Sequence, residues 1–176
     1  SYIKSMLKNG HQVWLVQMQY EDGSIPIDIS NSVHLINIPM KKTKKSNFVQ
    51  RYLKETLYFF RSYRSIKRIK NLDCIFLQST NSAYVPINIC NRKKVPLLYN
   101  VQDIFPMDAM LAGKLKNNSI AYKTLSYFQR KAYIRSDRLV TISDDMAKTI
   151  SDEIMNKGKV EVIYNWSYQN EGYEIA

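Results

Sequence analysis

Five polar residues follow short apolar runs of this chain, at points where buried strands are expected to end. They are Thr80, Asn81, Asp103, Ser143 and Asn165. A carboxylate can act as a base or accept a hydrogen bond from a hydroxyl group, while hydroxyl and amide groups can hold a polar ligand. In open parallel sheets, ligands bind just past the carboxyl ends of the strands. Asp103 is therefore the first candidate for chemistry.

Each of these residues also has a purely structural interpretation. Asp103 is equally suited to capping the turn that follows it, because aspartate side chains bond to nearby backbone groups. Ser143 precedes a predicted helix, and its residue type favours the N-cap role over ligand binding. Asn165 could contact a ligand or form a local turn of its own.

The hydrophobic pattern predicts the elements that must position these side chains. Strands are expected at residues 11–16, 33–38, 72–77, 95–101, 137–143 and 160–164. Helices are expected from residue 46 onward and at residues 82–94, 119–136 and 146–156. Strands that alternate with helices predict an α/β fold, with a doubly wound, mainly parallel sheet flanked by helices. The strand-end loops should then converge on one cleft.

The length of 176 residues suits a single domain, and a hydrophobic content of 45% is typical of a globular protein. We expect one Rossmann-like domain over residues 1–167, followed by a tail or the start of a linker at residues 168–176. Residues 1–10 resemble the end of a helix that stops at Gly10. We therefore expect a fragment whose first strand is absent.

Several chemistries find no support in the sequence. There is no glycine-rich phosphate loop and no G-x-S-x-G nucleophile motif. The only histidines, His11 and His34, lack nearby ligand partners, so we expect structural roles for both and no metal site. Cys74 and Cys90 are expected to be buried reduced thiols.

Positive charge is concentrated in residues 41–70, which hold eleven basic residues and one acidic residue, in a chain of formal net charge +11. Val49, Leu53, Leu57 and Phe60 recur at helical spacing within this segment. It is either a solvated helix face or a platform for an anionic membrane or ligand. The candidate residues of that platform are Lys41, Lys42, Lys44, Lys45, Arg51, Arg61, Arg64, Lys67 and Arg68.

Four stretches together resemble the N-terminal domain of GT-B fold glycosyltransferases of family 4, in the branch that builds bacterial surface polysaccharides. Residues 8–13, KNGHQV, are similar to that family's step from first helix to second strand. Residues 101–106, VQDIFP, with Gly113 after them, resemble its Q-D-[LI]-[WF]-P loop. Residues 137–143, DRLVTIS, and 159–166, KVEVIYNW, resemble its last two strands.

The resemblance implies a retaining transfer of a sugar from a nucleotide-sugar donor to a glycan acceptor, often lipid-linked, at the cytoplasmic face of the membrane. It implies no metal and no cofactor, since the nucleotide sugar is a substrate. Asp103 matches the position near the reacting sugar, Ser143 and Asn165 match positions lining the cleft, and Thr80 and Asn81 lie in the preceding strand-end loop. The donor half, a C-terminal domain, is outside this chain, so we expect the chain alone to be inactive.

Two alternatives remain on the sequence. The charge and aromatic content would also suit a nucleic-acid-binding module, although no RNA-binding motif with stacking aromatics on strands is present, and nucleic acid is not an expected partner. A non-catalytic ligand-binding α/β module would have the same topology. With family 4 as the preferred interpretation, we expect a cytoplasmic protein held peripherally on the inner face of the plasma membrane, with that anionic surface as a partner.

Overall fold

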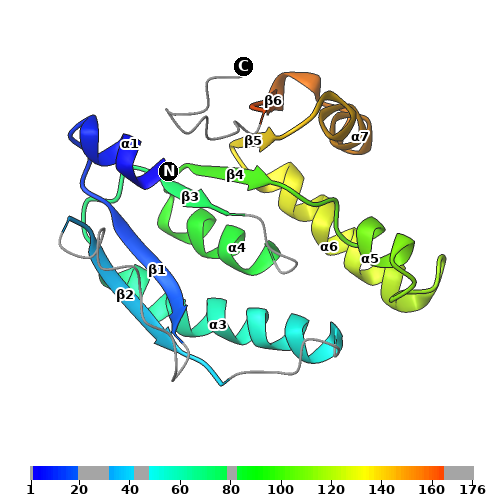
Figure 1. Ribbon diagram of the computed structural model, residues 1–176, viewed down its shortest axis with the longest axis horizontal. Helices are drawn as coiled ribbons and strands as arrows, with labels where there is room; N and C mark the ends of the chain where they lie inside the picture. Colours follow the sequence, from blue (N-terminus) through cyan, green and yellow to red (C-terminus); the bar gives the residue numbers. More distant parts are fainter. Residues whose placement is uncertain (1, 20–31, 42–47, 79–82, 165–176) are drawn as a thin grey trace, which may run out of the picture. The chain divides into compact units, whose positions relative to one another are not determined.

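The structure is a computed structural model that describes residues 2–19, 32–41, 48–78 and 83–164, without the side chains of residues 48, 49, 51 and 89–93. The chain divides into two compact units, Ser1–Leu72 and Asp73–Ala176. Each unit contains its own parallel sheet, one of two strands and one of four (Figure 1).

The first unit begins with α1 (Tyr2–Lys8), which ends as the sequence predicts. Gly10 has a φ of +81°, its N–H bonds to the Leu7 carbonyl at 3.0 Å, and the His11 N–H bonds to the Met6 carbonyl at 3.1 Å. This pair of bonds is a Schellman motif, which favours glycine because the left-handed conformation strains residues with a Cβ.

The strands β1 (Trp14–Gln19) and β2 (His34–Pro39) of the first unit pair in parallel, with Trp14 opposite His34. The long helix α3 (Phe48–Arg68) packs against this sheet. The Tyr58 hydroxyl donates to the Val16 carbonyl at 2.8 Å, and Arg61 Nη1 donates to the Pro39 carbonyl at 3.0 Å. These bonds fix which side of α3 faces the strands.

The second unit has four parallel strands in the order β3-β4-β5-β6, so that sequential strands are neighbours (Figure 1). Its elements are β3 (Ile75–Leu77), α4 (Tyr84–Lys93), β4 (Leu97–Val101), α5 (Met107–Leu111), α6 (Ile120–Arg135), β5 (Arg138–Thr141), α7 (Asp144–Ile154), the 3-10 turn η1 (Lys157–Lys159) and β6 (Val160–Val162).

The core of the second unit lies where β4 and β5 meet α6. Tyr99 and Leu139 are at most 1% exposed, and Tyr133 on α6 is fully buried with its ring 6.2 Å from that of Tyr99. The Tyr99 hydroxyl accepts a hydrogen bond from Gln129 Nε2 at 3.2 Å. Buried polar groups are stable when they are paired in this way.

Asp137 joins the beginnings of β4 and β5 through two bonds to one residue. Its Oδ2 accepts from the Leu97 N–H at 2.7 Å, and its own N–H donates to the Leu97 carbonyl at 3.1 Å. The carboxylate therefore accepts a hydrogen bond from a backbone N–H at the start of β4, one residue before the paired positions of β4 and β5 begin. The pairing sets the register in which Tyr99 lies opposite Leu139.

The predicted α/β fold class with parallel strands and flanking helices is confirmed, and each expected strand and helix has a counterpart. Some bounds differ, since β1 begins at Trp14 rather than residue 11 and β3 at Ile75 rather than residue 72. Three further details also differ. The short helix α5 was not predicted, α7 ends at Ile154 with Met155 in a left-handed conformation, and the Cys74 side chain is exposed rather than buried. Cys74 is the residue immediately before β3. The side chain of Cys90 is outside the described residues.

Replacing Asp137 by alanine should destabilise the chain, because the N–H of Leu97, a residue only 2% exposed, loses its acceptor. We expect a loss of about 1–3 kcal/mol in the free energy of unfolding, measured by urea denaturation near neutral pH. Asp152→Ala, which removes an exposed carboxylate from α7, is the control and should stay within about 0.5 kcal/mol. Equal effects of the two substitutions would contradict the role given to Asp137.

Candidate functional site

The ends of three strands in the second unit meet at one edge of the sheet. Val101 pairs with Thr141, and Thr141 pairs with Val162, so β4, β5 and β6 finish level with one another. Asp103, Ser143 and Tyr164 each follow two residues later. Because the strands are parallel, the residues that follow them are at the same carboxyl edge.

Asp103 is exposed and has no bond to any residue that the structure describes. The helix that follows, α5, begins at an N-cap, Pro106, with no side-chain hydrogen bond, and the Asp108 N–H bonds to the Ile104 carbonyl at 3.0 Å. Asp103 is thus not the cap of this helix. Its carboxylate is available to a ligand as an acceptor for a hydroxyl group.

Ser143 is the N-cap of α7, as its residue type predicts. Its hydroxyl oxygen accepts from the Met146 N–H at 3.3 Å, and its backbone carbonyl accepts from Thr141 Oγ1 at 3.3 Å. Asp144 and Asp145 in the first turn add negative charge at the positive end of the helix dipole. The hydroxyl proton of Ser143 can still be donated to a ligand, because capping uses only the oxygen.

The pair formed by Tyr164 and Asp144 was missed in the sequence analysis. The Tyr164 hydroxyl donates to Asp144 Oδ2 at 2.5 Å, which connects the end of β6 to the start of α7. This hydrogen bond, together with the negative charge of Asp144, raises the pKa of Tyr164. The two residues are 20 positions apart, so no local pattern announces their contact.

A second missed pair lies where β3 and β4 end. Asn100 is 1% exposed, and its Nδ2 donates to Gln78 Oε1 at 3.2 Å. Its Oδ1 has no partner among the described residues. An asparagine inside an apolar run was the available signal, since buried amides are uncommon and normally fully bonded.

The remaining predicted residues divide by what the structure describes. Thr80, Asn81 and Asn165 lie outside the described residues, as do Lys42, Lys44, Lys45 and the side chain of Arg51. Within the described ranges, no three His, Cys, Asp or Glu side chains gather to hold a metal ion. None of the helices described is both long and apolar enough to cross a membrane. Of the candidate basic residues, the structure describes Lys41, Arg61, Arg64, Lys67 and Arg68, and all five are exposed.

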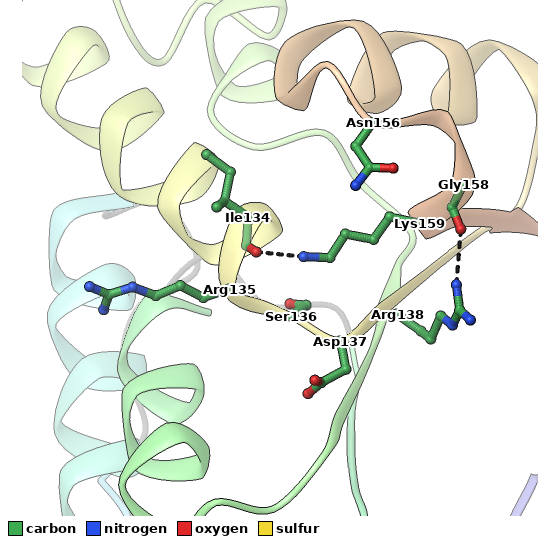
Figure 2. Close-up of a pocket in the computed structure, with 8 residues that line it drawn as sticks. All are labelled: Ile134, Arg135, Ser136, Asp137, Arg138, Asn156, Gly158 and Lys159. Atoms are coloured by element: carbon green, nitrogen blue, oxygen red, sulfur yellow. Dashed lines mark hydrogen bonds between the residues drawn. The ribbon is translucent and has the colours of Figure 1, made fainter.

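A pocket of about 470 Å³ lies at the opposite, amino edge of the same sheet (Figure 2). It is lined by Ile134, Arg135, Ser136, Asp137, Arg138, Asn156, Gly158 and Lys159. Figure 2 shows Lys159 Nζ directed at the Ile134 carbonyl, with a separation of 2.5 Å, and Arg138 directed at the Gly158 carbonyl, at 2.9 Å.

Lys159 and Arg138 in this pocket already donate hydrogen bonds to backbone carbonyls of the fold. Lys159 binds a carbonyl at the end of α6, where the negative end of the helix dipole attracts positive charge. Partial burial lowers the pKa of Lys159, and the nearby carboxylate of Asp137 opposes that shift. Since Asp103 and Ser143 follow the other ends of β4 and β5, this pocket is not the candidate site.

The described sheets are parallel and flanked by helices, and comparison with known proteins gives the same fold class. The chain resembles a solved structure titled "Crystal structure of LpCGTa in complex with UDP" with a TM-score of 0.56 and 7% identity, over 97% of this chain and 51% of that one. At this identity the likeness shows the fold alone.

The family follows from the sequence comparison. A family model for glycosyltransferase family 4 matches residues 2–166, and the chain belongs to this family. A curated relative, "Probable glycosyltransferase WbjE" of Pseudomonas aeruginosa, is 27% identical over 163 residues, which represent 87% of this chain and 39% of that protein. The chain thus spans well under half the length of this relative. The family predicted from the four motif-like stretches is confirmed.

The structure separates the stabilising role of Ser143 from the exposed position of Asp103. Ser143→Ala should lower the free energy of unfolding by about 1 kcal/mol, because α7 loses its N-cap. Asp103→Ala should change it by less than about 0.5 kcal/mol, since no described residue depends on that carboxylate. Chemical denaturation of both variants checks this, and a large loss for Asp103→Ala would mean that this side chain supports the fold.

Proposed function

We propose that this chain is the acceptor-side half of a retaining glycosyltransferase. The enzyme would transfer a sugar from a nucleotide-sugar donor to a lipid-linked glycan acceptor in the synthesis of a surface polysaccharide. The donor would be held mainly by a C-terminal domain of the same protein. Sugar transfer would take place in the cytoplasm, at the inner face of the plasma membrane.

The observation that carries this proposal is the exposed Asp103 at the carboxyl edge of a sheet that belongs to a family 4 domain. Support for a second half comes from coverage, because the chain represents 39% of the curated relative and 51% of the solved structure. That solved structure is a complex with UDP, which is consistent with a nucleotide-linked donor.

In the proposed reaction, the acceptor hydroxyl oxygen bonds to the anomeric carbon of the donor sugar while the bond from that carbon to the diphosphate oxygen breaks. The hydroxyl proton passes to the departing diphosphate, and the anomeric configuration is retained. Asp103 would accept a hydrogen bond from a neighbouring hydroxyl group of the acceptor and so orient the attacking oxygen toward the sugar. Ser143 would donate its remaining proton to the acceptor glycan, with Thr80, Asn81 and Asn165 as further proposed contacts.

Substituting Asp103 in the complete enzyme tests the catalytic role. Asp103→Asn keeps the size of the side chain but removes its charge, and we expect kcat/KM to fall by about 10²-fold or more. Asp108→Asn is the matched control, because Asp108 is an exposed carboxylate five residues further on, in α5. If both variants keep the activity of the parent enzyme, Asp103 does not participate in transfer.

The isolated 176-residue chain tests the division into halves. We expect no sugar transfer by the chain alone and no measurable binding of UDP, GDP or ADP in calorimetry. A short-chain polyprenyl-diphosphate N-acetylhexosamine should bind, and saturation-transfer NMR should detect the contact. Transfer catalysed by the chain alone, or nucleotide binding without acceptor binding, would reverse the proposed assignment of the halves.

A further inference from the structure

The outer side of α3 exposes a row of large apolar side chains. Leu53 is 60% exposed, Leu57 46% and Phe60 62%. At 3.6 residues per turn, these positions lie one above another along the helix. The sequence pattern correctly predicted the helix, but these residues do not form its packed side.

The packed side of α3 is made by other residues. Tyr58 and Phe59 are 9% exposed and Ser62 is 1% exposed, and Tyr58 bonds to β1. These three residues point about half a turn away from the exposed apolar row. The row is therefore not needed to hold α3 on its sheet. Within the first unit, α3 therefore has one apolar side that packs in the core and a second apolar side that is exposed.

Exposed cations surround the apolar row on the same outer side. Arg64 continues the row one turn beyond Phe60, and Lys67 and Arg68 follow on the next turn. Arg61 is also exposed but lies at the border with the packed side, where its Nη1 bonds to the Pro39 carbonyl, and Lys41 precedes the helix in sequence. The only acidic residue between positions 41 and 70 is Glu55. This side of α3 thus combines large apolar groups with a strong positive charge.

We propose that the outer side of α3 is a docking surface for an anionic membrane. Leu53, Leu57 and Phe60 would enter the boundary between headgroups and acyl chains, with the helix lying parallel to the membrane plane. Arg64, Lys67 and Arg68 would remain among the lipid phosphates, since long basic side chains can extend to the polar layer. This inference goes beyond sugar transfer and does not depend on the identity of donor or acceptor.

Charge complementarity favours a membrane over the other partners that an apolar face can bind. A second copy of this surface would bring two sets of like charges together, which opposes self-association. A nucleic acid would satisfy the cations but would leave the three aliphatic and aromatic side chains exposed to water. An acidic lipid surface offers both an apolar layer and negative phosphates within the width of one helix.

Co-sedimentation of the 176-residue chain with vesicles tests the proposal. We expect binding to phosphatidylcholine vesicles that contain about 30% phosphatidylglycerol, weak binding without the anionic lipid, and progressive loss between about 50 and 500 mM salt. Leu53→Gln with Phe60→Gln should weaken binding about tenfold or more, because the row loses its apolar groups. Arg64→Gln with Arg68→Gln should weaken it roughly fivefold per cation.

Matched controls separate this surface from general adsorption of a basic protein. Leu111→Gln with Ile120→Gln removes two apolar side chains of the second unit that are 72% and 86% exposed. Lys123→Gln with Lys148→Gln removes two exposed cations from α6 and α7. Neither control should alter vesicle binding by a comparable factor. Circular dichroism should show unchanged helix content in all variants, because glutamine is a good helix former.

A direct measure of insertion uses Phe60→Trp with lipids that carry a quencher at a known depth. We expect the strongest quenching near the headgroup boundary. The proposal is overturned if anionic vesicles do not bind, if the controls weaken binding as much as the α3 variants, or if the chain binds single-stranded RNA but not vesicles. A dimer in sedimentation velocity that is lost with Leu53→Gln and Phe60→Gln would identify a second copy as the occupant instead. None of these results depends on transferase activity.

Discussion

The second unit depends on the two hydrogen bonds between Asp137 and Leu97. They bind Leu97, the first residue of β4, to Asp137, the residue just before β5, and so oppose a shift of one strand along the other. A shift by one residue would turn the buried side chains of β4 to the other face. Because the starts are aligned, the ends are aligned as well, at Val101 and Thr141. The common edge on which Asp103 and Ser143 lie is a consequence of a bond made at the opposite end of the strands.

The stretches that resemble family motifs contain both structural and chemical residues. Asp137 holds two strands together, Lys159 binds the end of α6, and Ser143 caps α7. Asp103 is different, since no described residue relies on it. A resemblance in sequence therefore identifies the fold through its stabilising residues as much as it identifies a reaction. Family membership and the chemistry of a particular side chain need separate arguments.

Much of the fold was predictable because buried strands are short apolar runs and because Gly10 suits the left-handed conformation at the end of α1. The end of α7 was not predictable, since Met155 adopts a left-handed conformation that its residue type does not favour. For α3, periodicity predicted the helix, but the side chosen for packing depends on Tyr58 reaching β1. The pairs Tyr164–Asp144 and Gln78–Asn100 join distant positions, which a linear pattern does not encode.

The exposure of Asp103 also has an evolutionary consequence. No described residue depends on its carboxylate, whereas Phe105, two residues further on, is buried, and Asp137, Tyr99 and Leu139 maintain the scaffold. Substitutions of Asp103 itself can therefore accumulate without the loss of stability that eliminates most core variants. Under the proposed function, lineages that retain this scaffold could exchange one acceptor for another by changing exposed positions of this loop. The same separation would allow a laboratory library to vary the exposed positions of the loop while the domain stays folded.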